Sequence, residues 1–381
     1  MRTYSTWRMT MRWNKTLAVG AALVLSTACG GVDDQEALES LPDFAGTSLE
    51  INTSALAQDG AALVAQDLMQ VEASLDGQGA AMLEGARLEV KALNDTLRQV
   101  LVPIADLAKQ SANEQPGEVL VYGPTDRANA TFTLSIREGT GGRYQWKLEA
   151  RPLNSKDDVA YKLIAAGALK RSGDAHRGRG TLAISLDNLK AVAPAYAGQG
   201  KLMMSFAHFG KGSKSLAYRL ASFTPNPATH EAVTGAFVGH KIEATGVTRV
   251  RVLGPYNLPG TATSAKENVL SSVRHIPGSG GRVDVRAWGG DIAANTYYVG
   301  SACWDSQEKE VYRVLLQCSD SSRPENCTEV AGSRVGSFQA CPAVELRGDV
   351  TPPEGTGDAV TPEPGNPGAP DDVPTDVTPD F

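Results

Sequence analysis

The sequence predicts an α+β fold in which N-terminal helices pack on a large antiparallel β-meander. Between residues 55 and 107, apolar residues recur at spacings of three and four, which is typical of an amphipathic helix. After residue 116 the period changes to two, which is typical of strands with one buried and one solvated face. Turn-forming segments, rather than crossover helices, separate these strands, and this pattern favours an antiparallel sheet over a parallel one.

The helical region contains one long apolar stripe and one shorter one. The long stripe comprises Ala86, Val90, Leu93, Leu97, Val100, Ile104 and Leu107, and the shorter one comprises Leu56, Leu63, Val64, Leu68, Val71 and Leu75. The positions beside the long stripe lack the complementary charges of a coiled coil, so a helix packed on the protein's own sheet is favoured over a dimer zipper. Pro103 lacks an N–H group, so a kink or a helix end is expected there.

Strand periodicity is clearest where Tyr144, Trp146, Leu148 and Ala150 alternate with polar residues. Further strands are expected at residues 130–137, 159–169, 181–186, 201–208, 216–223, 236–244, 248–253, 281–287, 311–316 and 334–338, and a helical turn or loop at 187–200. One apolar sheet face is predicted to contain Phe132, Trp146, Leu148, Leu163, Ile184, Leu202 and Phe206. The helix bearing Leu93, Leu97 and Val100 either fills that face or leaves a cleft.

The N-terminus has the pattern of a secretion signal. Arg2, Arg8, Arg12 and Lys15 precede the short uncharged run of residues 17–25, which ends in small residues before Cys29. A membrane-spanning helix needs about 20 apolar residues, and this run is too short. The segment 1–28 is therefore predicted to be a cleaved signal peptide.

The segment Leu25-Ser26-Thr27-Ala28-Cys29-Gly30 resembles the lipobox of bacterial lipoproteins. It departs from the family pattern at Ser26, where a large aliphatic residue is usual. The resemblance implies that Cys29 is acylated, with palmitate-type chains, and becomes the lipid anchor of the mature protein. Gly30 occupies the position at which Asp would retain a lipoprotein in the inner membrane, so the resemblance implies the outer membrane.

Four further cysteines, Cys303, Cys318, Cys327 and Cys341, lie in one C-terminal stretch. An exported protein meets an oxidising compartment, where an even cluster indicates two disulfides. Their intervals of 15, 9 and 14 residues lack the close pairs of a zinc site, so no metal is expected. Turn-forming residues between Cys318 and Cys327 favour a hairpin that joins this pair, which leaves Cys303 to pair with Cys341.

The composition of the chain limits the classes of partner that it can bind and indicates how the chain is divided into segments. Without the four basic residues of the signal the chain has 32 Lys and Arg against 43 Asp and Glu, a net charge of −11, which argues against nucleic acid. The predicted organisation is a signal peptide (1–28), a lipid-anchored tether (29–45), a helical segment (46–115), a β-rich region (116–346) and a tail (347–381). From residue 350 the tail has eight prolines and seven acidic residues in 32 positions, which predicts disorder.

Several short segments match catalytic motifs in part, but none has the surrounding structure that the corresponding catalytic site requires. Residues 178–183 match G-x-G-x-x-A but precede a strand, residues 230–234 lack the second His of a zinc protease, and residues 306–309 match S-x-x-K in a hydrophilic turn. Residues 278–281 fail the serine-hydrolase pattern, and Arg347-Gly348-Asp349 is short enough to occur by chance. The histidines His176, His208, His230, His240 and His275 are scattered. No catalytic residue, metal ligand or cofactor is therefore predicted.

Two function classes remain. The favoured one is a non-catalytic envelope lipoprotein that binds an apolar ligand, a glycan or an envelope protein, or acts as a scaffold. The alternative is an envelope hydrolase whose site is assembled from dispersed residues. The predicted architecture is loosely similar to the half-barrel lipoprotein carriers of bacterial envelopes, which hold acyl chains in a concavity. That similarity concerns the fold and transfers no site residue.

Overall fold

The computed structural model describes residues 34–49, 51, 81–115, 119–172, 176–208, 213–227, 232–242, 246–256, 265–319 and 326–342. These residues all belong to one compact unit. The predicted signal peptide, Cys29, the whole of the shorter apolar stripe and the predicted acidic tail lie outside the described residues, as does His230.

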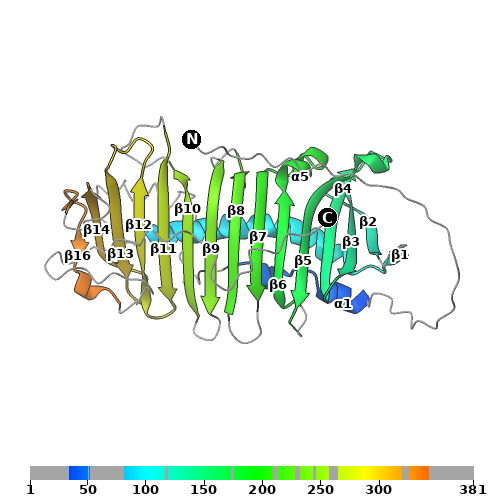
Figure 1. The fold of residues 1–381 in the computed structure, drawn as a ribbon, viewed down its shortest axis with the longest axis horizontal. Coiled ribbons are helices and arrows are strands. Elements are labelled where there is room, and N and C mark those ends of the chain that lie inside the picture. Colours follow the sequence, from blue (N-terminus) through cyan, green and yellow to red (C-terminus); the bar gives the residue numbers. More distant parts are fainter. Residues whose placement is uncertain are drawn as a thin grey trace. The chain divides into compact units, whose positions relative to one another are not determined.

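The described strands form one antiparallel sheet in strictly sequential order, β1 to β15, with β16 paired to β14 (Figure 1). The strands are β1 (Asn113–Gln115), β2 (Val119–Arg127), β3 (Ala130–Gly139), β4 (Arg143–Pro152), β5 (Lys162–Arg171), β6 (Gly178–Ser185), β7 (Gln199–His208), β8 (Ser213–Thr224), β9 (Val233–Ile242), β10 (Val247–Tyr256), β11 (Glu267–Ile276), β12 (Gly280–Trp288), β13 (Tyr297–Trp304), β14 (Glu310–Cys318), β15 (Cys327–Glu329) and β16 (Val335–Gly336). This architecture confirms the predicted α+β fold with a long β-meander.

The helices lie before the sheet and within its connections. They are α1 (Asp34–Glu39), α2 (Phe44–Thr47), α4 (Ala81–Leu107) and α5 (Leu186–Val192), with 3₁₀ turns η1 (Asp158–Ala160) and η3 (Phe338–Ala340). Among the described helices, none combines the length and the apolar run that a membrane crossing requires. The helical turn expected at 187–200 is α5, which Ser185 caps by accepting a hydrogen bond from the Asn188 N–H.

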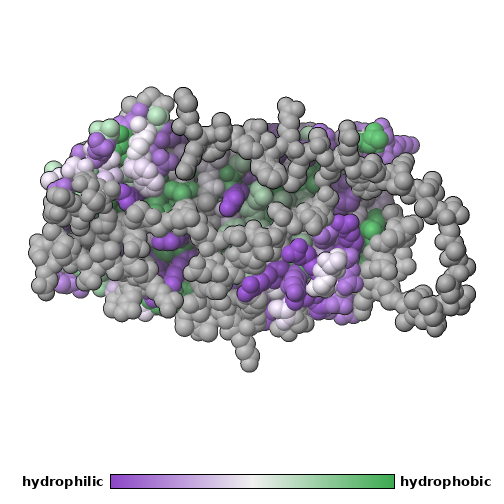
Figure 2. Space-filling view, viewed as in Figure 1, coloured by the Kyte–Doolittle hydropathy of each residue, from purple (hydrophilic) through white to green (hydrophobic). Residues whose placement is uncertain are grey.

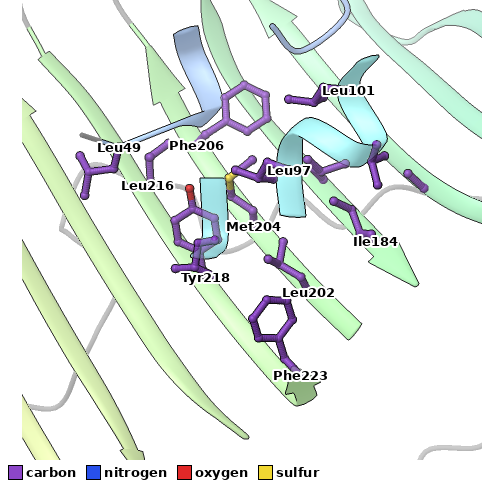
Figure 3. Packing of buried hydrophobic residues seen from close by; sticks show 14 of the residues in the cluster. Leu49, Leu97, Leu101, Ile184, Leu202, Met204, Phe206, Leu216, Tyr218 and Phe223 are labelled. Atoms are coloured by element: carbon purple, nitrogen blue, oxygen red, sulfur yellow. The ribbon is translucent and has the colours of Figure 1, made fainter. Parts of the chain in front are cut away.

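Helix α4 crosses behind the strands in Figure 1 and packs on one side of the sheet. We call this side the helix face. One of its cross-strand rows runs from Trp146 through Gly167 and Leu182 to Met204, and the three side chains of this row are buried. Leu97 of α4 is fully buried and lies beside Met204 and Leu202 (Figure 3). The long apolar stripe was therefore interpreted correctly: α4 covers its own sheet.

The sheet curves around α4. At one end a Cβ on Gly123 of β2 would lie 2.8 Å from Leu107, and at the other end Arg87 contacts Glu308, in the turn between β13 and β14. Twenty residues of helix are about 30 Å long. Eleven steps across a flat sheet, from β2 to β13, would measure about 53 Å. The two side chains of the Arg87–Glu308 contact bridge only part of the difference, so the sheet must bend toward the helix.

Large aromatic side chains fit beneath α4 because each lies over a glycine of the neighbouring strand. Trp146 is paired with Gly167, and Trp304 with Gly281. A Cβ at either glycine would lie 2.6 Å or less from the opposite indole ring, closer than atoms can approach. The glycines thus leave room for the two rings to lie along the sheet and keep the helix face smooth enough for a helix to pack on it.

Three predictions about this face and its helix need correction. Leu163 is 42% exposed, because the register of β4 and β5 shifts between Leu148 and Glu149 and turns Leu163 to the other side. Of the kink or helix end expected at Pro103, the helix end is excluded, because α4 continues to Leu107. The segment predicted as a tether up to residue 45 is folded from Asp34 onward, since Leu41 is 3% exposed within the core.

Strand boundaries differ in a few places. The strand expected from residue 159 begins at Lys162, because the 3₁₀ turn η1 precedes it. The strand expected at 334–338 is limited to Val335–Gly336 and is followed by η3. Five strands have no counterpart among the predicted ranges: the long strands β2, β11 and β13, and the three-residue strands β1 and β15.

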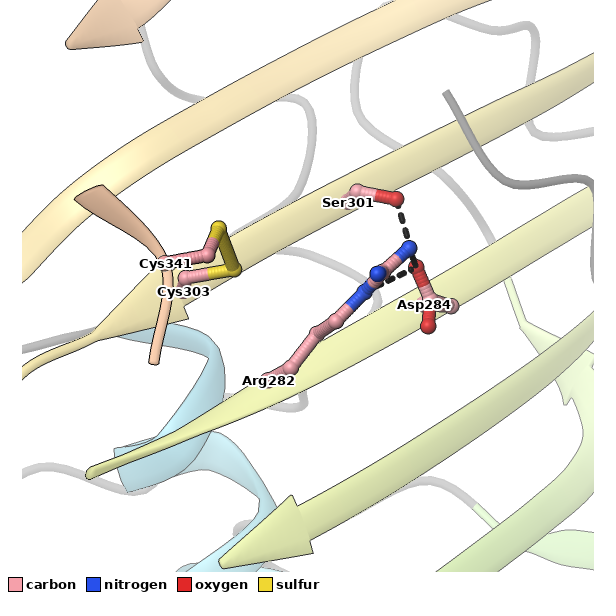
Figure 4. The surroundings of a disulfide bond; sticks show 5 residues. All are labelled: Arg282, Asp284, Ser301, Cys303 and Cys341. Carbon is pink, nitrogen blue, oxygen red and sulfur yellow. Dashed lines mark hydrogen bonds and ion pairs between the residues drawn. A yellow bond between two sulfur atoms is a disulfide. The ribbon is translucent and has the colours of Figure 1, made fainter. Parts of the chain in front are cut away.

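The C-terminal part carries both disulfides, and they join the predicted pairs. Cys318 bonds to Cys327 across the β14–β15 hairpin, and Cys303 of β13 bonds to Cys341, which follows η3 (Figure 4). Beside the second disulfide, Arg282 donates hydrogen bonds to Asp284, which also accepts one from Ser301 at 2.5 Å. Here the side of the sheet opposite α4, which we call the outer face, is buried too.

Elsewhere the outer face is mixed in character. Met203 is 57% exposed there, and the register places it between Ala183 and Arg219. Figure 2 views this face and shows hydrophobic residues over the central strands among hydrophilic ones. The outer face is therefore not a continuous apolar surface.

Candidate functional site

The residues from 34 to 49, which contain α1 and α2, run alongside α4 and are held by contacts at both ends (Figure 1). We call them the N-terminal strap. At its beginning, Tyr122 of β2 donates a hydrogen bond to Asp34, and Arg171 of β5 pairs with Glu36 at 3.1 Å and with Glu39 at 2.6 Å. Burial and the neighbouring Asp34 carboxylate raise the pKa of the Tyr122 hydroxyl, which therefore stays protonated as the donor at neutral pH.

The end of the strap is held through its backbone. Lys214 and Tyr218 of β8 donate to the carbonyl oxygens of Ala45 and Thr47 at 2.7 and 2.8 Å. Asn94 of α4 forms two hydrogen bonds with the backbone of Leu49, one as donor at 2.7 Å and one as acceptor at 3.3 Å. Because these groups are buried, each would cost stability if it lost its partner. The strap is thus fixed to the sheet and to α4.

A pocket of about 590 Å³ lies between this strap and the C-terminal half of α4. Its lining is mostly apolar, with nine such residues of fourteen. The apolar ones are Leu38, Leu41, Pro42, Phe44, Leu101, Val102, Ile104, Ala105 and Ala108, and the polar ones are Gln35, Glu39, Asp43, Arg98 and His176. Small-molecule sites have this size and this composition, with few polar groups among apolar walls.

Most polar groups of the pocket take part in holding the strap. Glu39 is paired with Arg171, and Asp43 accepts the Gly46 N–H at 2.7 Å as the N-cap of α2. His176 donates through Nδ1 to the carbonyl of Leu41 at 2.9 Å. No serine belongs to the lining, and the described residues contain no cluster of three or more His, Cys, Asp or Glu that could hold a metal. The pocket lining therefore has groups suited to binding and contains no Ser, Thr, Cys or Lys that could act as a nucleophile.

A second buried polar cluster lies at the other end of α4. Arg87 donates two hydrogen bonds to Glu308, at 2.5 and 2.8 Å, and both side chains are largely buried. Nearby, the indole N–H of Trp304 donates to Nδ1 of His275 at 3.3 Å. Burial, together with Arg87, holds the pKa of His275 below its usual value, while Glu308 opposes the shift. This cluster joins helix to sheet across a sequence separation of 221 residues.

A third polar pair lies on the last long strand of the sheet. Glu310 and Arg313 of β14 approach to 3.2 Å, with side chains exposed by only 2% and 7%. Burial raises the pKa of Glu310, and Arg313 opposes that shift. A perturbed carboxyl of this kind can mark a catalytic site. Here Glu310 belongs to neither the pocket lining nor the Arg87–Glu308 contact.

Two of the discounted motifs lie at least partly outside the turns in which they were expected. Residues 178–183 were expected to form a turn before a strand, but they belong to β6 itself, and residues 278–281 form the end of the turn and the first two residues of β12. Residues 306–309 form the β13–β14 turn, but Glu308 there is buried in its pair with Arg87 and is not a solvated turn residue. His208 and His275 are buried in the structure.

Sequence reasoning missed the pocket because it treated one wall as a tether. The sequence does contain a pattern that indicates a packed segment there, since the apolar residues Leu38, Leu41 and Phe44 recur at a spacing of three. Comparisons of the chain with protein-family models, with curated proteins and with solved structures found no match.

Proposed function

We propose that this chain is a lipid-anchored lipoprotein of the bacterial outer membrane, facing the periplasm or the cell surface, whose folded unit binds an apolar ligand without chemical conversion. The pocket between the strap and α4 carries the proposal. Its volume of about 590 Å³ falls within the roughly 300–1,000 Å³ typical of small-molecule sites, and its walls are mostly apolar.

The distance along the chain between the proposed anchor and the pocket supports a ligand of membrane origin. Gln35, the first residue of the pocket wall, follows Cys29 by six residues. An extended chain spans at most about 3.6 Å per residue, so the two Cα atoms cannot be more than about 22 Å apart. An acylated Cys29 would therefore keep the pocket near the membrane surface, where apolar molecules are concentrated.

The proposed anchor is tested by replacing Cys29 with Ala. A clickable fatty acid should label the unaltered protein in cells and should not label the variant, which should move from the membrane pellet to the soluble fraction. Continued labelling of the variant would exclude the anchor and leave the pocket unexplained.

Ligand binding is tested with the chain from residue 29 onward carrying Cys29→Ser, which needs no detergent. An apolar fluorescent probe should bind saturably at one site per chain. Replacing Ala105 by Trp should weaken this binding, because the indole would occupy space in the pocket, whereas Val159→Trp, at a position that is 87% exposed and outside the pocket, should not.

A scaffold is the second candidate, and the packing of α4 favours it. Leu93, Leu97 and Val100 are exposed by 3% or less, so the helix fills the sheet face at these positions. The sequence alone did not decide between a filled face and a cleft there. If the probe does not bind saturably, the scaffold replaces the ligand-binding proposal. Turnover of a substrate in a broad hydrolase screen would contradict both.

A further inference from the structure

Arg98 is a cation of the pocket lining whose ion pair in the described part of the chain is with Asp95 and not with an acidic residue of the strap. We infer that Arg98 makes the pocket selective for a long-chain fatty acid, whose chain occupies the apolar interior and whose carboxylate binds the guanidinium. This inference rests on the proposed ligand-binding function and specifies the ligand class.

Arg98 is held in place on one side by an aromatic ring. Its guanidinium carbon lies 4.6 Å from the centre of the Phe44 ring, in a cation–π contact. Both residues line the pocket. A guanidinium whose face rests on a ring keeps its edge N–H groups directed sideways, and this planar fork matches the two oxygens of a carboxylate.

The donors of Arg98 have little to bind within the described part of the chain. Its one ion pair there is with Asp95, at 3.9 Å, and the Arg98 side chain is 59% exposed. Asp95 is already paired with Lys91 at the much shorter distance of 2.5 Å. Arg98 can therefore accept a ligand carboxylate without breaking a strong contact.

The acidic residues of the pocket do not argue for a cationic ligand. Glu39 is engaged by Arg171 at 2.6 Å, and Gln35 donates to it at 3.1 Å. Asp43 caps α2 through the Gly46 N–H. A cationic ligand would have to compete with these contacts, whereas an anionic ligand finds the Arg98 donors available.

Lys91 provides a matched control for Arg98. It precedes Arg98 by seven residues on α4, also pairs with Asp95, and is not part of the pocket lining. Lys91→Gln therefore removes the same charge from the same helix and perturbs the same carboxylate. Only the contact with the pocket differs between the two variants.

The experiment measures displacement of the fluorescent probe by oleic acid and by methyl oleate, on the chain from residue 29 onward with Cys29→Ser. We expect oleic acid to bind the unaltered pocket at least ten-fold more tightly than the ester, a difference of about 1.4 kcal/mol. Arg98→Gln should abolish this preference, Lys91→Gln should keep it, and Arg98→Lys should keep part of it.

Each other outcome has a definite meaning. Equal affinity for acid and ester in the unaltered protein, or equal effects of Arg98→Gln and Lys91→Gln on the ratio, would overturn the inference and leave apolar binding intact. Tighter binding of a single-chain lysophospholipid than of oleic acid would reject the fatty acid as occupant. Failure of every lipid and of the probe to bind would instead refute the proposed function.

Discussion

The buried pair between Arg87 and Glu308 should carry a large share of the stability of the α4–sheet interface. The two side chains are exposed by only 6% and 12% and are joined by two hydrogen bonds. Replacing Arg87 by Met removes the cation and leaves the Glu308 carboxylate buried without its counter-charge. Breaking a buried ion pair in this way costs about 3–5 kcal/mol, which is large against the roughly 5–15 kcal/mol that stabilise a typical domain.

The free energy of unfolding can be measured by urea denaturation of the chain from residue 29 onward, with Cys29→Ser and both disulfides intact. Lys91→Met is the control, because Lys91 is 70% exposed and its pair with Asp95 should be worth less than about 1 kcal/mol. Adding Glu308→Gln to Arg87→Met should restore more than half of the loss, since the remaining side chain is then neutral. A loss below 1 kcal/mol for Arg87→Met would refute the reasoning.

Three further predictions follow from the core, the pKa shift and the disulfides. Gly167→Ala should lower the free energy of unfolding by about 1–3 kcal/mol and alter the fluorescence of Trp146, because the new methyl group would overlap its ring; an unchanged protein would contradict this packing. Burial holds the pKa of His275 below 6.5 in the folded state, so the unfolded state binds the proton more readily and stability should fall as the pH drops from 7 to 5. His275→Gln should reduce that slope in pH-dependent denaturation, and equal slopes would argue against a contribution from His275. Substituting Cys303 and Cys341 with Ala removes their disulfide and should lower the free energy of unfolding by about 4 kcal/mol in the loop-entropy model. The chain after η3 should then become accessible to limited proteolysis. Resistance to the protease would show that η3 is held without the disulfide.

The strands of the meander could be predicted where one face of the strand is solvent-exposed and the other is buried. Tyr144 to Arg151 show this alternation, and β4 forms there. Strand β13 was missed because its burial is almost continuous along its length, so its sequence does not alternate. β11 was missed because residues such as Ser271 and His275 are polar and yet buried. Periodicity detects a half-buried strand and fails for one covered on both sides.

Contacts across long sequence separations could not be predicted from local pattern. Glu308 looked like a solvated turn residue, and only the fold brings Arg87 to it. Leu163 had the polarity of a core residue, and the register shift in the pairing of β4 with β5 turned it outward. The disulfide pairing was predictable because turn-forming residues between Cys318 and Cys327 indicate a hairpin locally, which leaves one partner for each remaining cysteine.

The sequential strand order has a consequence for how an exported chain would assemble. Helix α4 precedes every described strand in the sequence, and each strand from β2 to β15 pairs with the one before it. A chain that emerges N-terminus first can therefore add one strand at a time to a single growing edge, with no earlier strand waiting for a distant partner. The apolar stripe of α4 is covered progressively as this edge advances. Because Glu308 follows β13, the Arg87–Glu308 pair can form only when the sheet is nearly complete, and its formation would report the end of assembly.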